Sequence, residues 1–408
     1  MPHTVIIGGS HAGVAAAAAL RQHDAEMDIT LLTAEAELPY QRPPLSKAYM
    51  SGDMDLDRLH LRPAAWYDEN RIDLKTGVAA SSIDRAGKSV HLTSGEMLRY
   101  DNLILATGAT ARRLPAEIGG DLPNVRVMRA LEDADGLMRD MEPGQKLVVI
   151  GGGYIGLEAA AEAAKKGLNV TVIEAAERIL RRVACRETAD VFKGLHEKHG
   201  VTILEDTQIE RFVESGGRAV AVRLAGGREL PLDIAITGIG IAPNVALAEA
   251  AGLQVAVGVI VDERGATSDS AIYAAGDCTV LPFDNHPTRL ESVQNAHDQA
   301  AVAAANICGV DTVYRPTPWF WSDQYDMKLQ IAGLNRGYDA VVARPGKREG
   351  SASHFYFKQG RFIAVDCLND AATYAACRKL LEAGAEIAPE QIADEAFDLR
   401  AAFKALAD

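Results

Sequence analysis

Two stretches of the chain place glycines in the same pattern between an apolar run and a run of small residues. The first, residues 5–20, reads VIIGGSHAGVAAAAAL, and the second, residues 147–164, reads LVVIGGGYIGLEAAAEAA. In such a turn the first glycine permits a tight bend, the second admits a close ligand, and the third lets a helix pack on a strand. The N–H groups at the start of the helix then attract phosphate. The two stretches therefore predict two dinucleotide sites.

The second stretch carries glycine at all three positions of the G-x-G-x-x-G pattern. Its candidate ligands are Gly151, Gly153, Tyr154, Ile155 and Gly156. Glu174 follows the next apolar run, where a carboxylate accepts hydrogen bonds from a ribose 2′-OH and repels a 2′-phosphate. We therefore expect this site to prefer NADH over NADPH. Further candidates for the same site are Arg182 and Gly240.

The first stretch departs from the pattern, because Ser10 stands where the second glycine is expected. Its hydroxyl either bonds a phosphate or forces a wider approach. The candidate ligands in this turn are Gly8, Ser10, His11, Ala12 and Gly13. After the next apolar run, Glu35 is the candidate to accept a hydrogen bond from the ribose. The adjacent Ala34 is also a candidate cofactor contact, but its side chain cannot accept such a bond.

Two more apolar runs end in glycine, which is typical of strand ends that meet a ligand. They are residues 103–109, LILATGA, and residues 272–282, IYAAGDCTVLP. The candidate residues at their ends are Ala106, Gly108, Gly276 and Asp277. Asp277 either bonds a ribityl hydroxyl of a flavin or caps the turn that follows.

The usual reason for one chain to hold two dinucleotides is the passage of a hydride from a nicotinamide to a flavin. We therefore expect FAD at the first turn and NADH at the second. The second turn precedes Asp277 in the chain, so the NAD domain is inserted into the FAD domain if Asp277 serves the first dinucleotide. The predicted domains are 1–112 with 247–318 for FAD, 113–246 for NAD, and 319–408 as a C-terminal interface domain.

The predicted fold class is α/β, with two Rossmann-type domains followed by an α+β domain. The tail carries runs typical of antiparallel strands between residues 327 and 369, with a hairpin turn at 358–361. Two helices are expected after it, near 370–383 and 389–406.

Composition and charge narrow the function classes. The chain has 408 residues and a net charge of −14, which argues against general binding to nucleic acid. It has no uninterrupted apolar stretch long enough to cross a membrane, and no signal-peptide pattern. Five cysteines without a C-x-x-C pair indicate a reducing compartment, so we expect a cytoplasmic protein.

Three further stretches carry a resemblance to a known family: residues 38–50, LPYQRPPLSKAYM; 289–300, RLESVQNAHDQA; and 318–325, PWFWSDQY. Together with the second glycine turn they resemble the NADH-dependent ferredoxin reductases of oxygenase and cytochrome P450 systems, the putidaredoxin reductase-like group. The resemblance implies a glutathione-reductase-like fold with FAD and NADH. It also implies a [2Fe–2S] ferredoxin as partner and, indirectly, a cytochrome P450 or another oxygenase.

The resemblance also implies roles for individual residues. Those expected at the flavin are Ala12, Arg42, Lys47, Ala80, Arg129, Asp277, Val293 and Trp321. Two of the expected roles are catalytic: Lys47 near flavin N5, and Glu158 beside the nicotinamide, paired with Lys47. The alternatives are a solvated surface lysine and a first-turn acid favoured by the helix dipole.

The expected chemistry is hydride transfer from NADH to FAD, followed by two single-electron transfers to the ferredoxin. Residues 41–47 contain no cysteine, which argues against a relative that works through a redox-active thiol. Two alternatives stay open. One is an NADH oxidase or rubredoxin reductase-like flavoenzyme, and the other is a redox-responsive flavoprotein resembling apoptosis-inducing factor.

Overall fold

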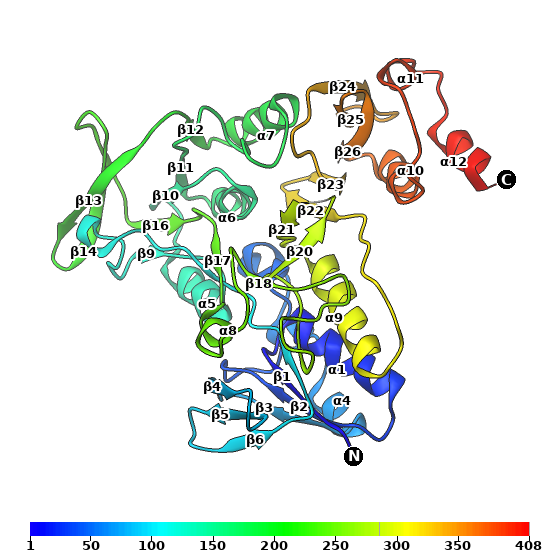
Figure 1. The fold of residues 1–408 in the computed structure, drawn as a ribbon. Coiled ribbons are helices and arrows are strands. Elements are labelled where there is room, and N and C mark those ends of the chain that lie inside the picture. The colour runs from blue at the N-terminus through cyan, green and yellow to red at the C-terminus, as the bar shows by residue number, and fades with distance from the viewer. Residues whose placement is uncertain (285, 408) are drawn as a thin grey trace. The chain divides into compact units, whose positions relative to one another are not determined.

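The computed structural model describes residues 1–284 and 286–407 (Figure 1). The chain divides into two compact units. The first unit contains Met1–Gln41, Asp55–Thr110 and Ile241–Pro316. The second unit contains Arg42–Met54, Ala111–Gly240 and Thr317–Asp408. The predicted division into three domains, with the bounds given above, stays a prediction. No helix in the described part of the chain is long and apolar enough to cross a membrane.

The first unit is built on a five-stranded parallel sheet in the order β19-β7-β1-β2-β3. Its strands are β1 His3–Ile7, β2 Asp28–Leu32, β3 Ile72–Lys75, β7 Asn102–Leu105 and β19 Ile272–Ala274. Helix α1, His11–His23, connects β1 to β2 and lies beside α9, Val293–Ile307 (Figure 1). The alanines of both helices form one buried cluster, because side chains of that size let two helices approach closely.

The other elements of the first unit are shorter. The helices are α3 Leu56–Leu59, α4 Ala64–Glu69 and α8 Ala246–Ala250. One small antiparallel sheet consists of β4 Ala80–Asp84, β5 Ser89–Leu92 and β6 Met97–Arg99. The strands β18 Val259–Ile260, β20 Thr279–Phe283 and β21 His286–Thr288 form a mixed sheet, in which β18 and β20 are parallel and β20 and β21 antiparallel.

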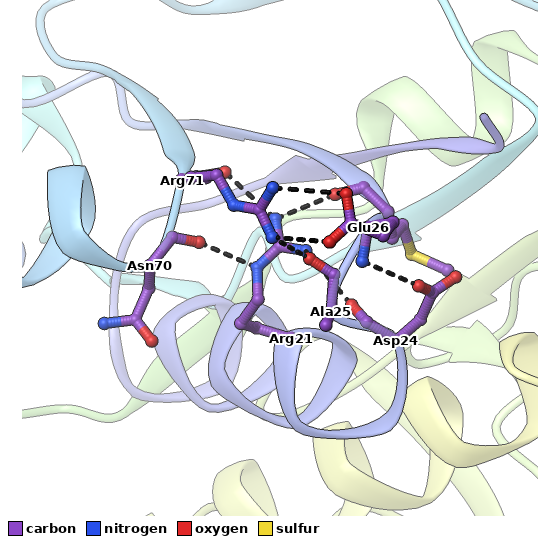
Figure 2. Close-up of polar contacts among 7 residues, drawn as sticks. Arg21, Asp24, Ala25, Glu26, Asn70 and Arg71 are labelled. Atoms are coloured by element: carbon purple, nitrogen blue, oxygen red, sulfur yellow. Dashed lines mark hydrogen bonds and ion pairs between the residues drawn. The ribbon is translucent and has the colours of Figure 1, made fainter.

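Arg21 fixes the carboxyl end of α1 (Figure 2). Its guanidinium donates to the main-chain carbonyls of Asp24, Ala25, Met27, Asn70 and Arg71 at 2.7–3.0 Å. A cation is favoured there, because the last carbonyls of a helix carry partial negative charge. The bonds to Asn70 and Arg71 connect this end of α1 to the residues that precede β3. The helix that begins at the first glycine turn is therefore held at its other end as well.

The second unit repeats the same start. Its parallel sheet has the order β12-β11-β10-β16-β9. The strands are β9 Val125–Arg126, β10 Lys146–Ile150, β11 Asn169–Ile173, β12 Thr202–Leu204 and β16 Ile234–Thr237. Helix α6, Tyr154–Lys165, connects β10 to β11 as α1 connects β1 to β2. Each glycine turn thus lies in a strand–turn–helix–strand unit, as expected for the start of a Rossmann-type domain.

Three more helices and a small sheet complete this part of the second unit. The helices are α2 Ala48–Ser51, α5 Leu131–Asp140 and α7 Arg186–Lys198. The antiparallel strands are β13 Ile209–Ser215, β14 Arg218–Leu224 and β15 Glu229–Pro231. A 3-10 helix, η1 Pro43–Ser46, precedes α2. A second one, η2, covers Ala116–Ile118.

The C-terminal residues form an antiparallel sheet in the order β22-β23-β26-β25-β24. Its strands are β22 Trp319–Gln324, β23 Met327–Gly333, β24 Ala340–Pro345, β25 Ala352–Lys358 and β26 Arg361–Leu368. The predicted hairpin at 358–361 is confirmed. Gln359 and Gly360 both have positive φ, as a two-residue turn of this kind requires.

The predicted helix near 370–383 is α10, Ala371–Glu382, whereas the single helix expected near 389–406 is wrong. Two helices, α11 Pro389–Ala393 and α12 Leu399–Ala407, occupy that stretch. The physical reason is a second helix start at Asp398. Its carboxylate accepts from the N–H groups of Arg400 and Ala401 at 2.8 and 3.2 Å, as an N-capping side chain does.

A buried polar cluster joins α7 to the C-terminal sheet. The Thr188 hydroxyl donates to Asp366 Oδ2 at 2.7 Å, and the Tyr356 hydroxyl donates to the same oxygen. The Cys185 N–H donates to the Tyr356 oxygen at 2.8 Å. Asp366 is fully buried, and burial raises its pKa from 3.8 to about 7 in spite of these donors. The carboxyl group therefore keeps its proton in the folded protein at pH values at which it loses it in the unfolded chain.

This difference predicts a pH-dependent stability. Between pH values of about 4 and about 7 only the folded state holds the Asp366 proton, so stability falls as the pH rises through that window. We expect Asp366→Asn to remove that fall. The stability of the variant relative to the parent should therefore be higher at pH 8, about one unit above the window, than at pH 5, about one unit inside its lower end. Denaturant midpoints at the two pH values measure it. The exposed Asp73→Asn is the control, and an identical pH dependence of Asp366→Asn and the parent would contradict the assignment.

Candidate functional site

The second glycine turn, between β10 and α6, is shaped by close backbone contacts. A Cβ on Gly156 would lie 2.2 Å from the carbonyl oxygen of Gly151, and a Cβ on Gly151 would lie 2.5 Å from that of Gly238. Gly151 also has φ of 106°, which other residues rarely adopt. A Cβ on Gly153, by contrast, would meet nothing within 4 Å among the residues that the structure describes. Gly151 and Gly156 thus serve packing, and Gly153, the second glycine of the pattern, leaves the space that a phosphate group needs.

The other candidates of this turn are the first residues of α6 and an acid bonded to the turn. Tyr154 and Ile155 form the first turn of α6; the Tyr154 ring lies 5.1 Å from the Phe320 ring, and Ile155 is 40% exposed. Glu174 follows β11, and its carboxylate accepts from the N–H groups of Gly152 and Ala176 at 2.7 and 2.8 Å. These bonds hold the acid beside the turn, where the sequence predicts a ribose.

Arg182 and Gly240 lie near one another. A Cβ on Gly240 would be 3.7 Å from an Arg182 guanidinium nitrogen. The positive φ of Gly240, 99°, explains why glycine stands there. Their contact with a dinucleotide stays a prediction.

The first glycine turn, between β1 and α1, uses the same constraints. A Cβ on Gly8 would lie 2.0 Å from the carbonyl oxygen of Ala106, at the end of β7, and one on Gly13 would lie 1.8 Å from that of Gly8. Ser10 is the N-cap residue of α1 in an extended conformation, and its side chain makes no capping hydrogen bond to the described residues. Its hydroxyl is therefore not used by the helix that it precedes.

Helix α1 also brings the Gly-Asp strand end to this turn. A Cβ on Gly276 would lie 3.2 Å from the Ala12 methyl, and Asp277 follows directly. His11, the first residue of α1, lies 3.2 Å from His297 of α9, measured from Nδ1 to Nε2. The turn and the end of β19 therefore adjoin, as expected for residues that share one ligand.

The other candidates of the first unit occupy neighbouring strand and helix ends. Glu35 and Ala34 follow β2, and the Glu35 carboxylate accepts from the Tyr40 hydroxyl. The remaining three are Gly108 after β7, Ala80 at the start of β4 and Val293 at the start of α9. Their contact with a flavin stays a prediction.

Glu158 is a buried acid of the second unit whose two carboxylate oxygens both accept hydrogen bonds. It lies in α6, is 3% exposed, and accepts from Lys47 Nζ at 2.6 Å and from Ser46 Oγ at 2.7 Å, both on Oε2. Its other oxygen, Oε1, accepts from Ser322 Oγ at 2.6 Å. The structure thus contains the expected Lys47–Glu158 ion pair. Since the Lys47 side chain is only 17% exposed, the alternative of a solvated surface lysine does not describe it.

The remaining flavin candidates also belong to the second unit. Arg42 Nη1 donates to the carbonyl oxygen of Arg129 at 2.9 Å, which brings these two residues together. Trp321 is half-buried in β22, with its ring 5.6 Å from that of Trp319. Sequence reasoning missed Ser46 and Ser322. The alternation of β22 was the available signal for Ser322, because it puts that residue on the face opposite Trp321.

The five cysteines are all free. Cys278 adjoins Asp277, is fully buried, and lies within 3.5 Å of the carbonyl oxygens of Leu105 and Ala275. Burial raises the pKa of its thiol, which keeps it protonated and unreactive.

The different surroundings of the glycines predict different effects of alanine. We expect Gly153→Ala to fold like the parent but to bind NAD⁺ about tenfold more weakly, because its methyl fills the space for the phosphates. Gly156→Ala is expected to lower the melting temperature, because its methyl meets a carbonyl oxygen. Calorimetric titration and thermal unfolding measure the two effects. Undiminished NAD⁺ affinity in Gly153→Ala would show that the turn holds no phosphate.

Comparisons with known proteins extend over nearly the whole chain. A family model described as pyridine nucleotide-disulphide oxidoreductase matches residues 2–300, and one described as reductase C-terminal matches 319–403. The rhodocoxin reductase of Rhodococcus erythropolis is 44% identical over 98% of this chain and 93% of its own.

Two solved structures are also similar over nearly the whole chain. The ferredoxin reductase for the CYP199A2 system from Rhodopseudomonas palustris has a TM-score of 0.95 and 41% identity, over 98% of this chain and 100% of that chain. The covalent putidaredoxin reductase–putidaredoxin complex has a TM-score of 0.95 and 38% identity, over 100% of this chain and 99% of that chain. The similarity is therefore not confined to one unit.

Proposed function

The chain belongs to the pyridine nucleotide-disulphide oxidoreductase family, among its ferredoxin reductases, and from this membership we propose its function. It passes electrons from NADH through FAD to a [2Fe–2S] ferredoxin that serves a cytochrome P450 or another oxygenase. The observation that carries the proposal is the presence of two separate glycine turns in one chain, each shaped by contacts that only glycine permits.

The residues of each turn fit the dinucleotide proposed for it. For FAD the first unit offers the turn from Gly8 to Gly13, with Gly276 and Asp277 beside it. For NADH the second unit offers the open space at Gly153 and the carboxylate of Glu174. When bound, FAD converts the two-electron reduction by NADH into the single-electron transfers that a [2Fe–2S] cluster accepts.

Two side chains of the second unit have roles in the hydride transfer. Lys47 supplies a positive charge that favours the reduced flavin, and Glu158 holds its ammonium group in place. Glu158 also orients the nicotinamide. Arg42, Arg129 and Trp321 are assigned to the flavin on the family resemblance.

The acceptor is proposed to be a protein cluster rather than a disulphide. Residues 41–47 contain no cysteine, and burial raises the pKa of Cys278, so neither supplies the thiolate that disulphide exchange requires. We also propose a cytoplasmic location, which the five free cysteines support.

A reductase assay tests the proposed acceptor. With FAD-loaded protein and NADH under air, we expect addition of a P450-system [2Fe–2S] ferredoxin such as putidaredoxin to raise the rate of NADH oxidation about tenfold or more. NADPH is expected to be the poorer donor, because Glu174 repels its 2′-phosphate. A rate set by oxygen and unaffected by ferredoxin would indicate an oxidase. Slow turnover with a stable charge-transfer complex would indicate a redox-responsive binding protein.

Substitution of the lysine tests its role at the flavin. We expect Lys47→Ala to slow the bleaching of the flavin band by NADH about tenfold or more, because the charge beside the flavin is lost and Glu158 is left unpaired. Stopped-flow absorbance under anaerobic conditions measures this rate. Lys193→Ala is the matched control, since it removes a partner of a different carboxylate, Glu205, in the same unit. Unchanged bleaching in Lys47→Ala would contradict the assignment.

A further inference from the structure

The W-S-D-Q stretch, residues 321–324, contains two fully buried polar side chains to which the proposed function assigns no role. Strand β22 alternates, so that Trp321 and Asp323 lie on one face and are half-buried, whereas Ser322 and Gln324 lie on the other and are fully buried. A buried polar side chain is costly unless it is hydrogen-bonded. The partners of Ser322 and Gln324 are therefore the reason for their presence.

These two residues connect Glu158 to His196 of α7, which is also fully buried. Ser322 Oγ donates to Glu158 Oε1 at 2.6 Å, and Gln324 Nε2 donates to Ser322 Oγ at 3.1 Å. Gln324 Oε1 then lies 2.9 Å from His196 Nε2. The residues come from α6, β22 and α7, which are far apart in the sequence, and their side chains meet in the interior of the second unit.

The chemistry of the groups sets the direction of each bond. An amide oxygen only accepts, so His196 Nε2 carries the proton that it gives to Gln324. His196 Nδ1 is then an acceptor, and the Tyr325 hydroxyl lies 3.3 Å from it. Burial lowers the pKa of His196 to about 4, in keeping with a neutral ring that bears one proton. Every link therefore donates toward the Glu158 carboxylate.

The hydrogen bonds from His196 to Gln324, to Ser322 and to Glu158 form a row in which all donors point the same way. Each bond of such a row polarises the next, which strengthens the bond from Ser322 to the charged oxygen of Glu158. Glu158 Oε1 is held by this row, and Glu158 Oε2 by Ser46 and Lys47. The carboxylate is thereby fixed from both sides. A carboxylate released on the Ser322 side could rotate, and the Lys47 ammonium would move with it.

We propose that Ser322, Gln324 and His196 are positioning residues that fix the orientation of the Glu158 carboxylate and, through it, of Lys47. The predicted effect on NADH-driven reduction rests on the proposed function. The direction of the hydrogen bonds from His196 to Glu158 does not rest on the proposed function, because it follows from contacts within the second unit.

The first test separates reduction from binding. We expect Ser322→Ala to slow flavin bleaching at saturating NADH about tenfold, with a change of less than about twofold in the NADH dissociation constant, because no group at the phosphate turn is altered. Gln324→Met is expected to slow it less. Ser353→Ala is the control: this serine is 1% exposed, lies in the same sheet and donates to a carboxylate, Asp370, at 3.1 Å. Anaerobic stopped-flow at varied NADH gives both constants.

The second test has a readout that does not depend on activity. Nitrogen NMR of histidine-labelled protein, with the His196 signal identified by its loss in His196→Gln, reports which ring nitrogen is protonated. We expect a neutral ring with the proton on Nε2 in the parent, and a loss of this preference in Gln324→Met. This measurement also decides the proposal if Ser322→Ala does not fold.

Three results would overturn the proposal. The first is a rate of flavin bleaching in Ser322→Ala equal to that of the parent. The second is a bleaching rate in Ser353→Ala as slow as that in Ser322→Ala, and the third is a proton on His196 Nδ1 in the parent. A parent protein that NADH does not bleach at all would instead refute the proposed function, and the NMR result would still decide whether the row points toward Glu158.

Discussion

A buried ion pair, between Lys47 and Glu158, connects separate segments of the second unit. A carboxylate that is 3% exposed is costly unless its charge and its lone pairs are satisfied. Lys47 supplies the charge at 2.6 Å, and Ser46 and Ser322 supply two further donors. Ser46 and Lys47 are consecutive residues where η1 meets α2, and Ser322 lies in β22, so two distant parts of the sequence converge on one residue of α6. Loss of a single partner of such a buried pair costs about 3–5 kcal/mol.

A second constraint, close approach of backbone to backbone, shapes both glycine turns. In each turn the third glycine of the pattern packs its Cα against the carbonyl oxygen of the first, where a methyl group would overlap it. The turns differ at the middle position, which is the open Gly153 in one and Ser10 in the other. The hydroxyl of Ser10 makes no capping hydrogen bond to the described part of its helix, and its contact with a phosphate stays a prediction.

Local signals made both glycine turns and one C-terminal hairpin predictable. The glycine spacing and the apolar runs beside it predicted both strand–turn–helix–strand starts, because each is specified within about 30 consecutive residues. The hairpin at 358–361 was predictable for the same reason. The second C-terminal helix was not, since the break before Asp398 depends on one capping side chain rather than on a change of hydrophobic pattern.

The polar surroundings of Glu158 lay beyond sequence reasoning for a different reason. The resemblance implied the pairing of Lys47 with Glu158, but no spacing rule connects residue 158 with residues 322, 324 and 196. The grouping of Arg42–Met54 with the second unit, rather than with its chain neighbours, is likewise a product of tertiary contacts. Burial alternation along β22 identifies which side chains face inward, and only the fold identifies what they meet.

A double-mutant cycle on the rate of flavin bleaching by NADH tests most directly whether Lys47 and Glu158 act as one unit. The rate would be measured for the parent, Lys47→Ala, Glu158→Gln and the double variant. The account predicts that the double variant is no slower than the slower single variant, because each substitution already abolishes the pair. Independent effects that multiply in the double variant would contradict it.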